Sequence, residues 1–144
     1  MEYISKSVKD TGNLGKKIAS MSKEGAVFCL YGDLGVGKTV FARSFINYFI
    51  PAVRVLSPSY IIVRHYKTNK KEIKEIIHLD LYRLEKKTDI DKLGIFELFE
   101  IDQALVLIEW ADRLGEKLPS KRTDIHFNYL KNNQRSIKVS NNKE

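Results

Sequence analysis

The run from Gly32 to Thr39 holds the residues best suited to chemistry, in the order Gly-Asp-Leu-Gly-Val-Gly-Lys-Thr. It fits the pattern G-x-x-x-x-G-K-[ST], in which glycines allow backbone N–H groups to turn inward around a phosphate. The Lys38 ammonium would neutralise the β- and γ-phosphate oxygens, and the Thr39 hydroxyl would bind Mg²⁺. The run therefore predicts a site for a nucleoside triphosphate and its metal. A glycine turn that only caps a helix is the alternative interpretation.

The whole loop is expected to contact the nucleotide, because its backbone surrounds the phosphates. We predict nucleotide contacts from eight consecutive residues: Asp33, Leu34, Gly35, Val36, Gly37, Lys38, Thr39 and Val40. Within this set, Lys38 is also predicted to be catalytic and Thr39 to be a metal ligand.

Two carboxylates follow apolar runs and could complete the metal site. Glu109 follows Leu105–Ile108, and Asp80 follows Ile76–Leu79. Either acid alone could simply be solvated at a strand end, but parallel strands bring their carboxyl ends to one ligand crevice. We therefore predict that Glu109 binds the metal, directly or through water, and that Asp80 orients metal-bound or attacking water. The two roles could be exchanged.

A strand, a glycine loop and a helix must follow one another to position this site. The apolar run Ala26–Tyr31 ends at Gly32, which predicts a strand buried on both faces of a parallel sheet. From Thr39 to Phe49, apolar residues recur at helical spacing until Pro51 ends the pattern. This order of elements is the one that a phosphate-binding loop requires.

The remaining pattern predicts an α/β protein with the fold of the P-loop NTPases. Its sheet is expected to be mainly parallel and flanked by helices, with antiparallel strands added near the C-terminal end. One or two short helices are predicted between residues 90 and 101. Further strands are predicted at 53–56, 60–66, 73–79 and 104–108, with an antiparallel pair at 123–129 and 134–140 around an Asn132-Asn133 turn.

Length and composition predict a single P-loop ATPase domain over residues 1–144. No apolar run approaches the roughly 20 residues of a membrane-spanning helix, and the single cysteine, Cys29, cannot form an internal disulfide. We therefore expect a cytoplasmic protein without a membrane partner. The net charge of +7 suits an anionic partner. Lysines such as Lys70 and Lys71, however, are more typical of a solvated surface than of direct nucleic-acid binding.

Other reactive residues give weaker signals. Ser57-Pro58-Ser59-Tyr60 could turn hydroxyls toward the γ-phosphate, although an ordinary turn is the better interpretation. His65, His78 and His126 lie too far apart in sequence to indicate a metal cluster, so we interpret them as core or surface residues. The run Asn69–Glu72 ends in the wrong acid for the guanine-binding pattern N-K-x-D, which disfavours GTP.

Four motifs, in this order, closely resemble those of the TsaE (YjeE) family. They are the run Gly32–Thr39, then Ser57–Tyr60, then His-Leu-Asp-Leu-Tyr-Arg-Leu at His78–Leu84, then Ile-Glu-Trp at Ile108–Trp110. The resemblance implies an ATPase of the bacterial machinery that attaches threonylcarbamoyl to the adenosine beside the tRNA anticodon. It implies TsaB and TsaD as partners, and it implies that tRNA is reached only through their complex.

The same resemblance implies roles for individual residues. Lys38 and Thr39 would contact phosphate and Mg²⁺, Asp80 and Glu109 would be the essential acids, and Trp110 would lie beside the bound ATP. Departures from the family pattern occur at Ser59-Tyr60 and after Trp110, where Ala111-Asp112 replaces the usual proline and glutamate. A hydroxyl is retained at Ser59, but the role of the second acid is open.

Two other functions would use the same loop. A small phosphotransferase would need an arginine-rich lid, for which the sequence offers no pattern, and a module that only binds nucleotide would not position water. No arginine is marked by its position as an internal finger, so we expect hydrolysis that is weak alone and stimulated by partners.

Overall fold

One mixed β-sheet runs through the part of the chain that the computed structural model describes, residues 1–56, 62–84 and 90–143. Its strands are β1 (Glu2–Ser5), β2 (Val27–Tyr31), β3 (Val63–Lys67), β4 (Glu75–Asp80), β5 (Ala104–Glu109), β6 (Lys121–Tyr129) and β7 (Arg135–Lys143). The α-helices are α1 (Val8–Ser20), α2 (Lys38–Phe49) and α3 (Ile95–Leu98). Short 3₁₀ turns occupy Ile90–Leu93, Ala111–Arg113, Gly115–Lys117 and Lys131–Asn133.

The strand order is β1-β7-β6-β2-β5-β4-β3. The four central strands, β6, β2, β5 and β4, are parallel to one another. The outer pairs, β6–β7 and β7–β1 on one side and β4–β3 on the other, are antiparallel. This arrangement confirms the predicted α/β fold, with antiparallel strands near the C-terminal end. A further antiparallel strand, β3, lies at the opposite edge.

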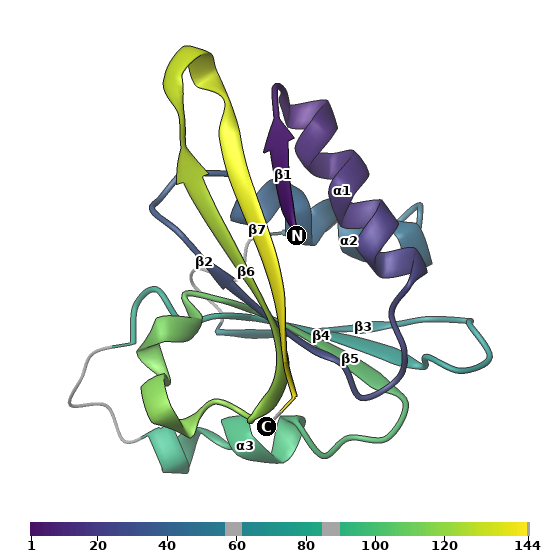
Figure 1. Cartoon of the computed structure of the whole chain (residues 1–144). Coiled ribbons are helices and arrows are strands. Elements are labelled where there is room, and N and C mark those ends of the chain that lie inside the picture. The colour runs from purple at the N-terminus through teal and green to yellow at the C-terminus, as the bar shows by residue number, and fades with distance from the viewer. Residues whose placement is uncertain (57–61, 85–89, 144) are drawn as a thin grey trace.

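Helices cover the two faces of the sheet, as Figure 1 shows, with α1 and α2 on one face and α3 on the other. The first core, under α1 and α2, includes Phe41, Phe45 and Leu107. The second core includes Cys29 and Ile108. Because both faces are covered, every residue of β4 and β5 is buried, which explains the continuous apolar run Ala104–Ile108 in β5.

The contact between α1 and α2 is close enough to require glycine. A Cβ atom at Gly15 would lie 2.7 Å from the Phe41 carbonyl oxygen and 3.3 Å from the Phe45 nitrogen, both on the backbone of α2. This approach lets α1 pack tightly against the helix that follows the phosphate loop. No helix in the described ranges is long and apolar enough to cross a bilayer.

The predicted strand at residues 53–56 is wrong, because this segment has no regular secondary structure. The Asn47 side chain of α2 donates hydrogen bonds to the carbonyls of Ile50 (3.2 Å) and Val53 (2.9 Å). These bonds fasten the segment to the end of α2, so it does not join the sheet. The strand predicted at 60–66 is found at Val63–Lys67, and its first residues, 60 and 61, fall outside the described ranges.

The sequence analysis assigned no structure to residues 1–25, which form β1 and α1. Ser7 caps α1, because its hydroxyl accepts a hydrogen bond from the Asp10 N–H at 3.0 Å. The Asp10 carboxylate in turn accepts the Lys6 N–H at 2.9 Å. A serine followed three residues later by an acid is a helix-start signal that could have been used.

Candidate active site

The loop between β2 and α2 has a shape that depends on its glycines. Gly32, Gly35 and Gly37 have φ values of 147°, 76° and 118°, in the region that disfavours side chains. A Cβ atom at Gly32 would also lie 2.7 Å from the Phe127 carbonyl oxygen and 2.8 Å from Val36 Cγ1. Val36 is buried as a whole residue, whereas Leu34 and Gly35 are exposed. The loop therefore turns Leu34 and Gly35 toward the solvent.

Lys38 begins α2, and its ammonium folds back across the loop. It donates hydrogen bonds to the carbonyls of Gly32 and Asp33, the second at 3.0 Å. It also lies 4.3 Å from the centre of the Trp110 ring. Burial lowers the pKa of Lys38, and the nearby carboxylates, Glu109 first, act in the opposite direction. The Lys38 ammonium would form stronger hydrogen bonds if charged phosphate oxygens replaced these neutral carbonyls as its acceptors.

Thr39 and Glu109 meet across the gap between α2 and β5. The Thr39 hydroxyl donates a hydrogen bond of 2.9 Å to Glu109 Oε1. Asp80 is the register partner of Glu109 on β4, so the carboxyl ends of the two strands lie side by side as predicted. Asp80 Oδ1 accepts the Tyr82 N–H at 2.9 Å, which holds that carboxylate at the end of its strand.

A pocket of about 260 Å³ lies among these groups. It is lined by the residues Leu34, Gly35, Gly37, Lys38, Thr39, Val40, Asp80, Tyr82, Glu109 and Trp110. Two acids, a hydroxyl and a lysine thus converge on one cavity. Such a set can hold a phosphate chain at one end and a hard cation at the other.

Trp110 forms one wall of this pocket in a strained conformation. Its φ is 58°, which is rare for a residue with a large side chain. The Tyr82 ring lies 5.0 Å from the Trp110 ring, and the Arg113 guanidinium lies 5.3 Å from it. Such strain persists only where the surroundings enforce it, and it is commonly found at functional sites.

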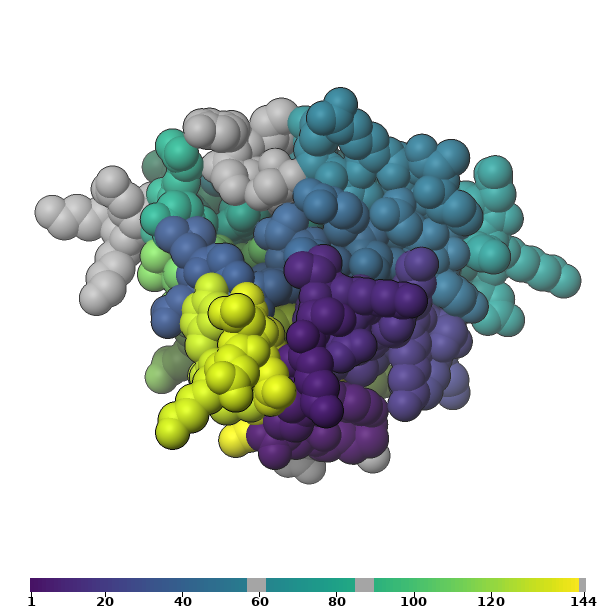
Figure 2. All heavy atoms as spheres, turned by 90° about the horizontal axis from the view of Figure 1, so that it is seen from above, coloured from purple at the N-terminus to yellow at the C-terminus, as the bar shows by residue number. Residues whose placement is uncertain are grey.

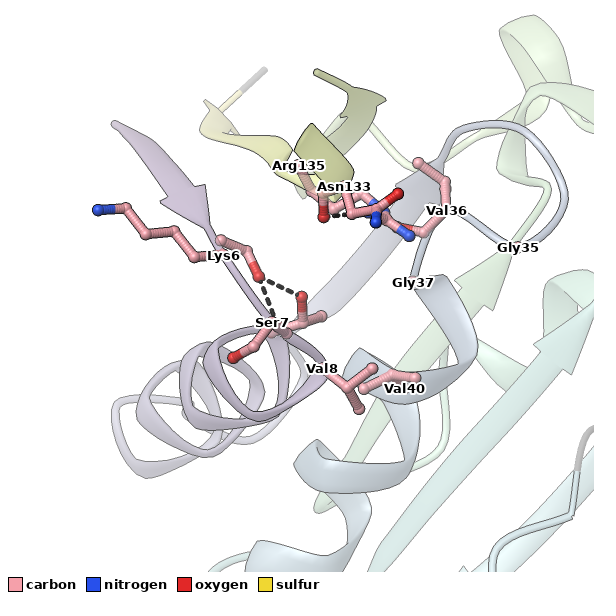
Figure 3. A pocket seen from close by; sticks show the side chains of 11 residues that line it. Lys6, Ser7, Val8, Gly35, Val36, Gly37, Val40, Asn133 and Arg135 are labelled. Atoms are coloured by element: carbon pink, nitrogen blue, oxygen red, sulfur yellow. Dashed lines mark hydrogen bonds between the residues drawn. The ribbon is translucent and has the colours of Figure 1, made fainter. Parts of the chain in front are cut away.

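A second pocket, of about 290 Å³, lies on the other side of the loop. Figure 2 shows the turn between β6 and β7, the start of the chain and the loop after β2 as neighbours on one surface. In Figure 3, side chains from these three segments surround the pocket. Arg135 reaches into it and donates through Nε to the Val36 carbonyl at 3.2 Å. The Tyr129 hydroxyl likewise donates to the Leu34 carbonyl at 3.2 Å.

The structure brings the predicted site residues together around the two pockets. Of those named from the sequence, only Asp33 lines neither pocket, and it contributes a carbonyl to Lys38 instead. Ser57-Pro58-Ser59-Tyr60 lies outside the described ranges. The sequence analysis gave no site role to Tyr82, Tyr129 or Arg135. The last two come from a turn far along the chain, and no local pattern connects them to the loop.

The first pocket offers too few metal ligands to bind Mg²⁺ without a nucleotide. Among the described residues, no group of three or more His, Cys, Asp or Glu side chains could hold a metal ion. Thr39 and Glu109 offer a hydroxyl and a carboxylate, which are hard oxygen ligands, and phosphate oxygens and water usually complete such a site. The residues present therefore fit a metal that arrives with its nucleotide.

Comparison with known proteins identifies the family. A family model described as threonylcarbamoyl adenosine biosynthesis protein TsaE matches residues 5–137. The chain belongs to the TsaE family. The match begins at the last residue of β1 and ends within β7, so the TsaE model covers the five strands between them and every residue that lines the two pockets. It confirms the resemblance found in the sequence motifs.

TsaE relatives from several bacteria match along nearly the whole chain. The tRNA threonylcarbamoyladenosine biosynthesis protein TsaE of Rickettsia bellii is 34% identical over 141 residues, 97% of this chain and 94% of the relative. The protein of the same name from Bacillus subtilis is 33% identical over 129 residues, 90% of this chain and 78% of the relative. The crystal structure of YdiB from Bacillus subtilis superimposes with a TM-score of 0.80 at 26% identity, covering 99% of this chain and 85% of that one.

Proposed function

We propose that this protein is a Mg²⁺-dependent ATPase that serves the attachment of threonylcarbamoyl to tRNA adenosine. The observation that carries the ATPase proposal is the hydrogen bond between Thr39 and Glu109 at the start of α2. A hydroxyl at the end of a phosphate loop, bonded to a carboxylate at the tip of the adjoining strand, is the arrangement that holds Mg²⁺ in P-loop enzymes. Family membership and the names of the relatives support the tRNA role.

Each group of the site has a part in this proposal. The loop backbone and Lys38 would bind the β- and γ-phosphates, and Thr39 and Glu109 would hold Mg²⁺. Bound Mg²⁺ would supply positive charge to the phosphate oxygens as negative charge develops on them. Asp80, held by the Tyr82 N–H, would orient water toward the γ-phosphate. Trp110 would cover the phosphates on the side of the Lys38 ammonium.

The second pocket is the proposed site for the nucleoside. It adjoins the same loop residues, Gly35 and Gly37, from the side opposite to the carboxylates. Its walls combine apolar side chains such as Val8 with the polar groups of Arg135 and Asn133. Nucleotide pockets have this composition, in which apolar walls hold a base and a few polar groups orient it.

Partners are proposed to complete the site. No arginine among the described residues lines the pocket that contains Asp80 and Glu109. An arginine supplied by a partner is a common way to accelerate phosphoryl transfer. We therefore propose that TsaB and TsaD stimulate hydrolysis, that tRNA is reached through their complex, and that the protein acts in the cytoplasm.

Phosphate release measured on the purified chain tests this function. We expect slow, Mg²⁺-dependent release from ATP, and a rise of about tenfold or more when TsaB and TsaD are added. The Lys38→Ala variant should bind ATP weakly and release no phosphate, and it is the matched negative control. Transfer of the γ-phosphate to an acceptor instead of water would favour a small kinase. Fast release by the chain alone, unchanged by the partners, would contradict the accessory role.

A further inference from the structure

His78 makes a buried contact with the carboxylate of Glu109. Its Nε2 atom lies 2.6 Å from Glu109 Oε2, and the exposed fractions of the two side chains are 0% and 2%. The residues come from neighbouring parallel strands, with His78 opposite Leu107 and Glu109 opposite Asp80 in the register. His78 is thus the diagonal neighbour of Glu109 on the face covered by α2.

Of the two ring nitrogens of His78, only Nε2 makes a hydrogen bond to a described residue, and that residue is Glu109. A carboxylate only accepts hydrogen bonds, so the shared hydrogen belongs to His78 Nε2. The other nitrogen, Nδ1, is buried and has no hydrogen-bond partner among the described residues. A polar ring placed in a buried strand between Ile77 and Leu79 costs free energy that an apolar side chain would avoid. The hydrogen bond to Glu109 must therefore explain why a histidine stands at this buried position.

We propose that His78 is a positioning residue that fixes the orientation of the Glu109 carboxylate for metal binding. The two oxygens of Glu109 have separate donors, Thr39 on Oε1 at 2.9 Å and His78 on Oε2 at 2.6 Å. A carboxylate held at one oxygen can rotate about its last bond, whereas one held at both cannot. His78 thereby keeps Oε1 directed toward Thr39. This inference rests on the proposed role of Glu109 as a metal ligand.

The expected effect is large because, in the described part of the chain, His78 is the donor found on Glu109 Oε2, and its loss would free that oxygen. Removing a group that orients a metal ligand typically lowers metal affinity or activity by about 10–100-fold. The loss should appear mainly in the Mg²⁺ concentration needed for half-maximal activity, since the phosphate loop itself is untouched. A merely structural histidine would instead lower stability and leave the metal requirement unchanged.

Two substitutions separate the hydrogen bond from packing. His78→Leu fills the space without an N–H donor, and His78→Gln keeps a donor of similar reach. Ile76→Val is the packing control, because Ile76 is buried on the same strand and the same face as His78. Should His78→Leu fail to fold, His78→Met provides a second side chain without a donor.

Metal affinity is measured directly by titrating Mn²⁺ into the ADP-bound chain and following the free ion by electron paramagnetic resonance. We expect His78→Leu to bind Mn²⁺ about tenfold or more weakly, while His78→Gln stays within about threefold of the wild type. Ile76→Val should bind Mn²⁺ normally despite a lower melting temperature. The ATPase assay should give the same order for the Mg²⁺ requirement.

Normal Mn²⁺ affinity in His78→Leu would overturn the inference, as would equal losses in the Leu and Gln variants. Either result would leave the proposed ATPase function intact. A wild-type chain that binds ADP but shows no Mn²⁺ site would overturn the metal role of Glu109 and this inference together. The wild-type titration therefore shows whether the role of His78 alone is wrong or whether the metal role of Glu109 is wrong as well.

Discussion

Asp80 and Glu109 are register partners on adjacent parallel strands, so two carboxylates from separate segments end side by side beneath the phosphate loop. Their surroundings differ. Glu109 is bonded to the Thr39 hydroxyl, whereas Asp80 Oδ1 is held by the Tyr82 backbone N–H. Because of this difference, the proposed mechanism gives the metal to Glu109 and the water to Asp80. The two roles can be told apart by substituting each acid in turn.

Substitution of the two acids should give different defects. Glu109→Gln removes the charge beside Thr39, so we expect the Mg²⁺ requirement to rise by about tenfold or more. Asp80→Asn should still bind Mg-ATP, but its kcat should fall by about 100-fold or more, as for the loss of a general base. Nucleotide titration and phosphate release at several Mg²⁺ concentrations measure both effects. The exposed Asp102→Asn is the control, and the reverse pattern would exchange the roles.

The Thr39 hydroxyl should matter only when metal is present. Thr39→Ala removes the donor to Glu109 and the proposed metal ligand, whereas Thr39→Ser keeps the oxygen. We expect the Ala variant to lose about tenfold in ATP affinity with Mg²⁺ and little in its absence, and the Ser variant to behave like the wild type. Binding of a fluorescent nucleotide with Mg²⁺ or with a chelator measures this. Equal losses under both conditions would argue against a metal contact.

The turn between β6 and β7 should support the phosphate loop through Tyr129. Tyr129→Phe removes the hydrogen bond to the Leu34 carbonyl and nothing else. An exposed hydrogen bond contributes little, so ATP affinity should fall by about threefold. Tyr48→Phe, an exposed tyrosine on α2, is the matched control and should bind ATP normally. Indistinguishable affinities of the two variants would mean that the Tyr129 hydrogen bond does not restrain the loop.

Gly15→Ala should destabilise the fold without altering the site chemistry. The added methyl would press against the Phe41 carbonyl oxygen, and such overpacking typically costs about 1–3 kcal/mol. The exposed neighbour, Lys16→Ala, should change stability by less than about 0.5 kcal/mol. Urea denaturation measures the free energy of unfolding of both. A Gly15→Ala variant as stable as the wild type would mean that α1 can shift away from α2 at no cost.

Cys29 should be unreactive in the native protein. Burial raises the pKa of its thiol from 9.0 to about 12, with the Asp124 carboxylate acting in the same direction. Since the thiolate is the reactive form, native chain at about pH 8 should react with thiol reagents far more slowly than unfolded chain. Fast labelling of the native chain would contradict the burial of this residue.

The same shift links Cys29 to stability at high pH. A pKa raised on folding means that the unfolded state loses its proton first as the pH rises. The contribution of Cys29 to stability is therefore constant below pH 9.0 and is lost between 9.0 and about 12. Urea denaturation of the wild type and of Cys29→Ala should diverge over this range, with the wild type losing more stability. Parallel curves would contradict the shift.

Continuous apolar runs made the central sheet predictable. A strand covered on both faces must be apolar throughout, and so residues 104–108 predict β5 and residues 26–31 predict β2 with only small errors at their ends. The phosphate loop is predictable because its backbone shape requires particular glycines. The two acids are predictable because their strands end where a parallel sheet gathers its ligands.

Residues whose roles depend on distant partners were not predictable. A lone histidine such as His78 looks like core, and only the register of β4 against β5 places it beside Glu109. Similarly, Arg135 reaches the loop after β2 only because β6 and β7 pair and turn back there. The segment at 53–56 has strand-like composition, but the Asn47 side chain holds it to α2.

The order of strands in space has a consequence for synthesis. β2, which leads into the phosphate loop, pairs with β6 from near the end of the chain, and β1 pairs only with β7. On the ribosome, β2 therefore remains an edge strand with unpaired backbone groups until β6 emerges. β1, although made first, has no partner until β7 is complete. The phosphate loop is thus made about 90 residues before Tyr129 of β6, whose hydroxyl donates to the Leu34 carbonyl.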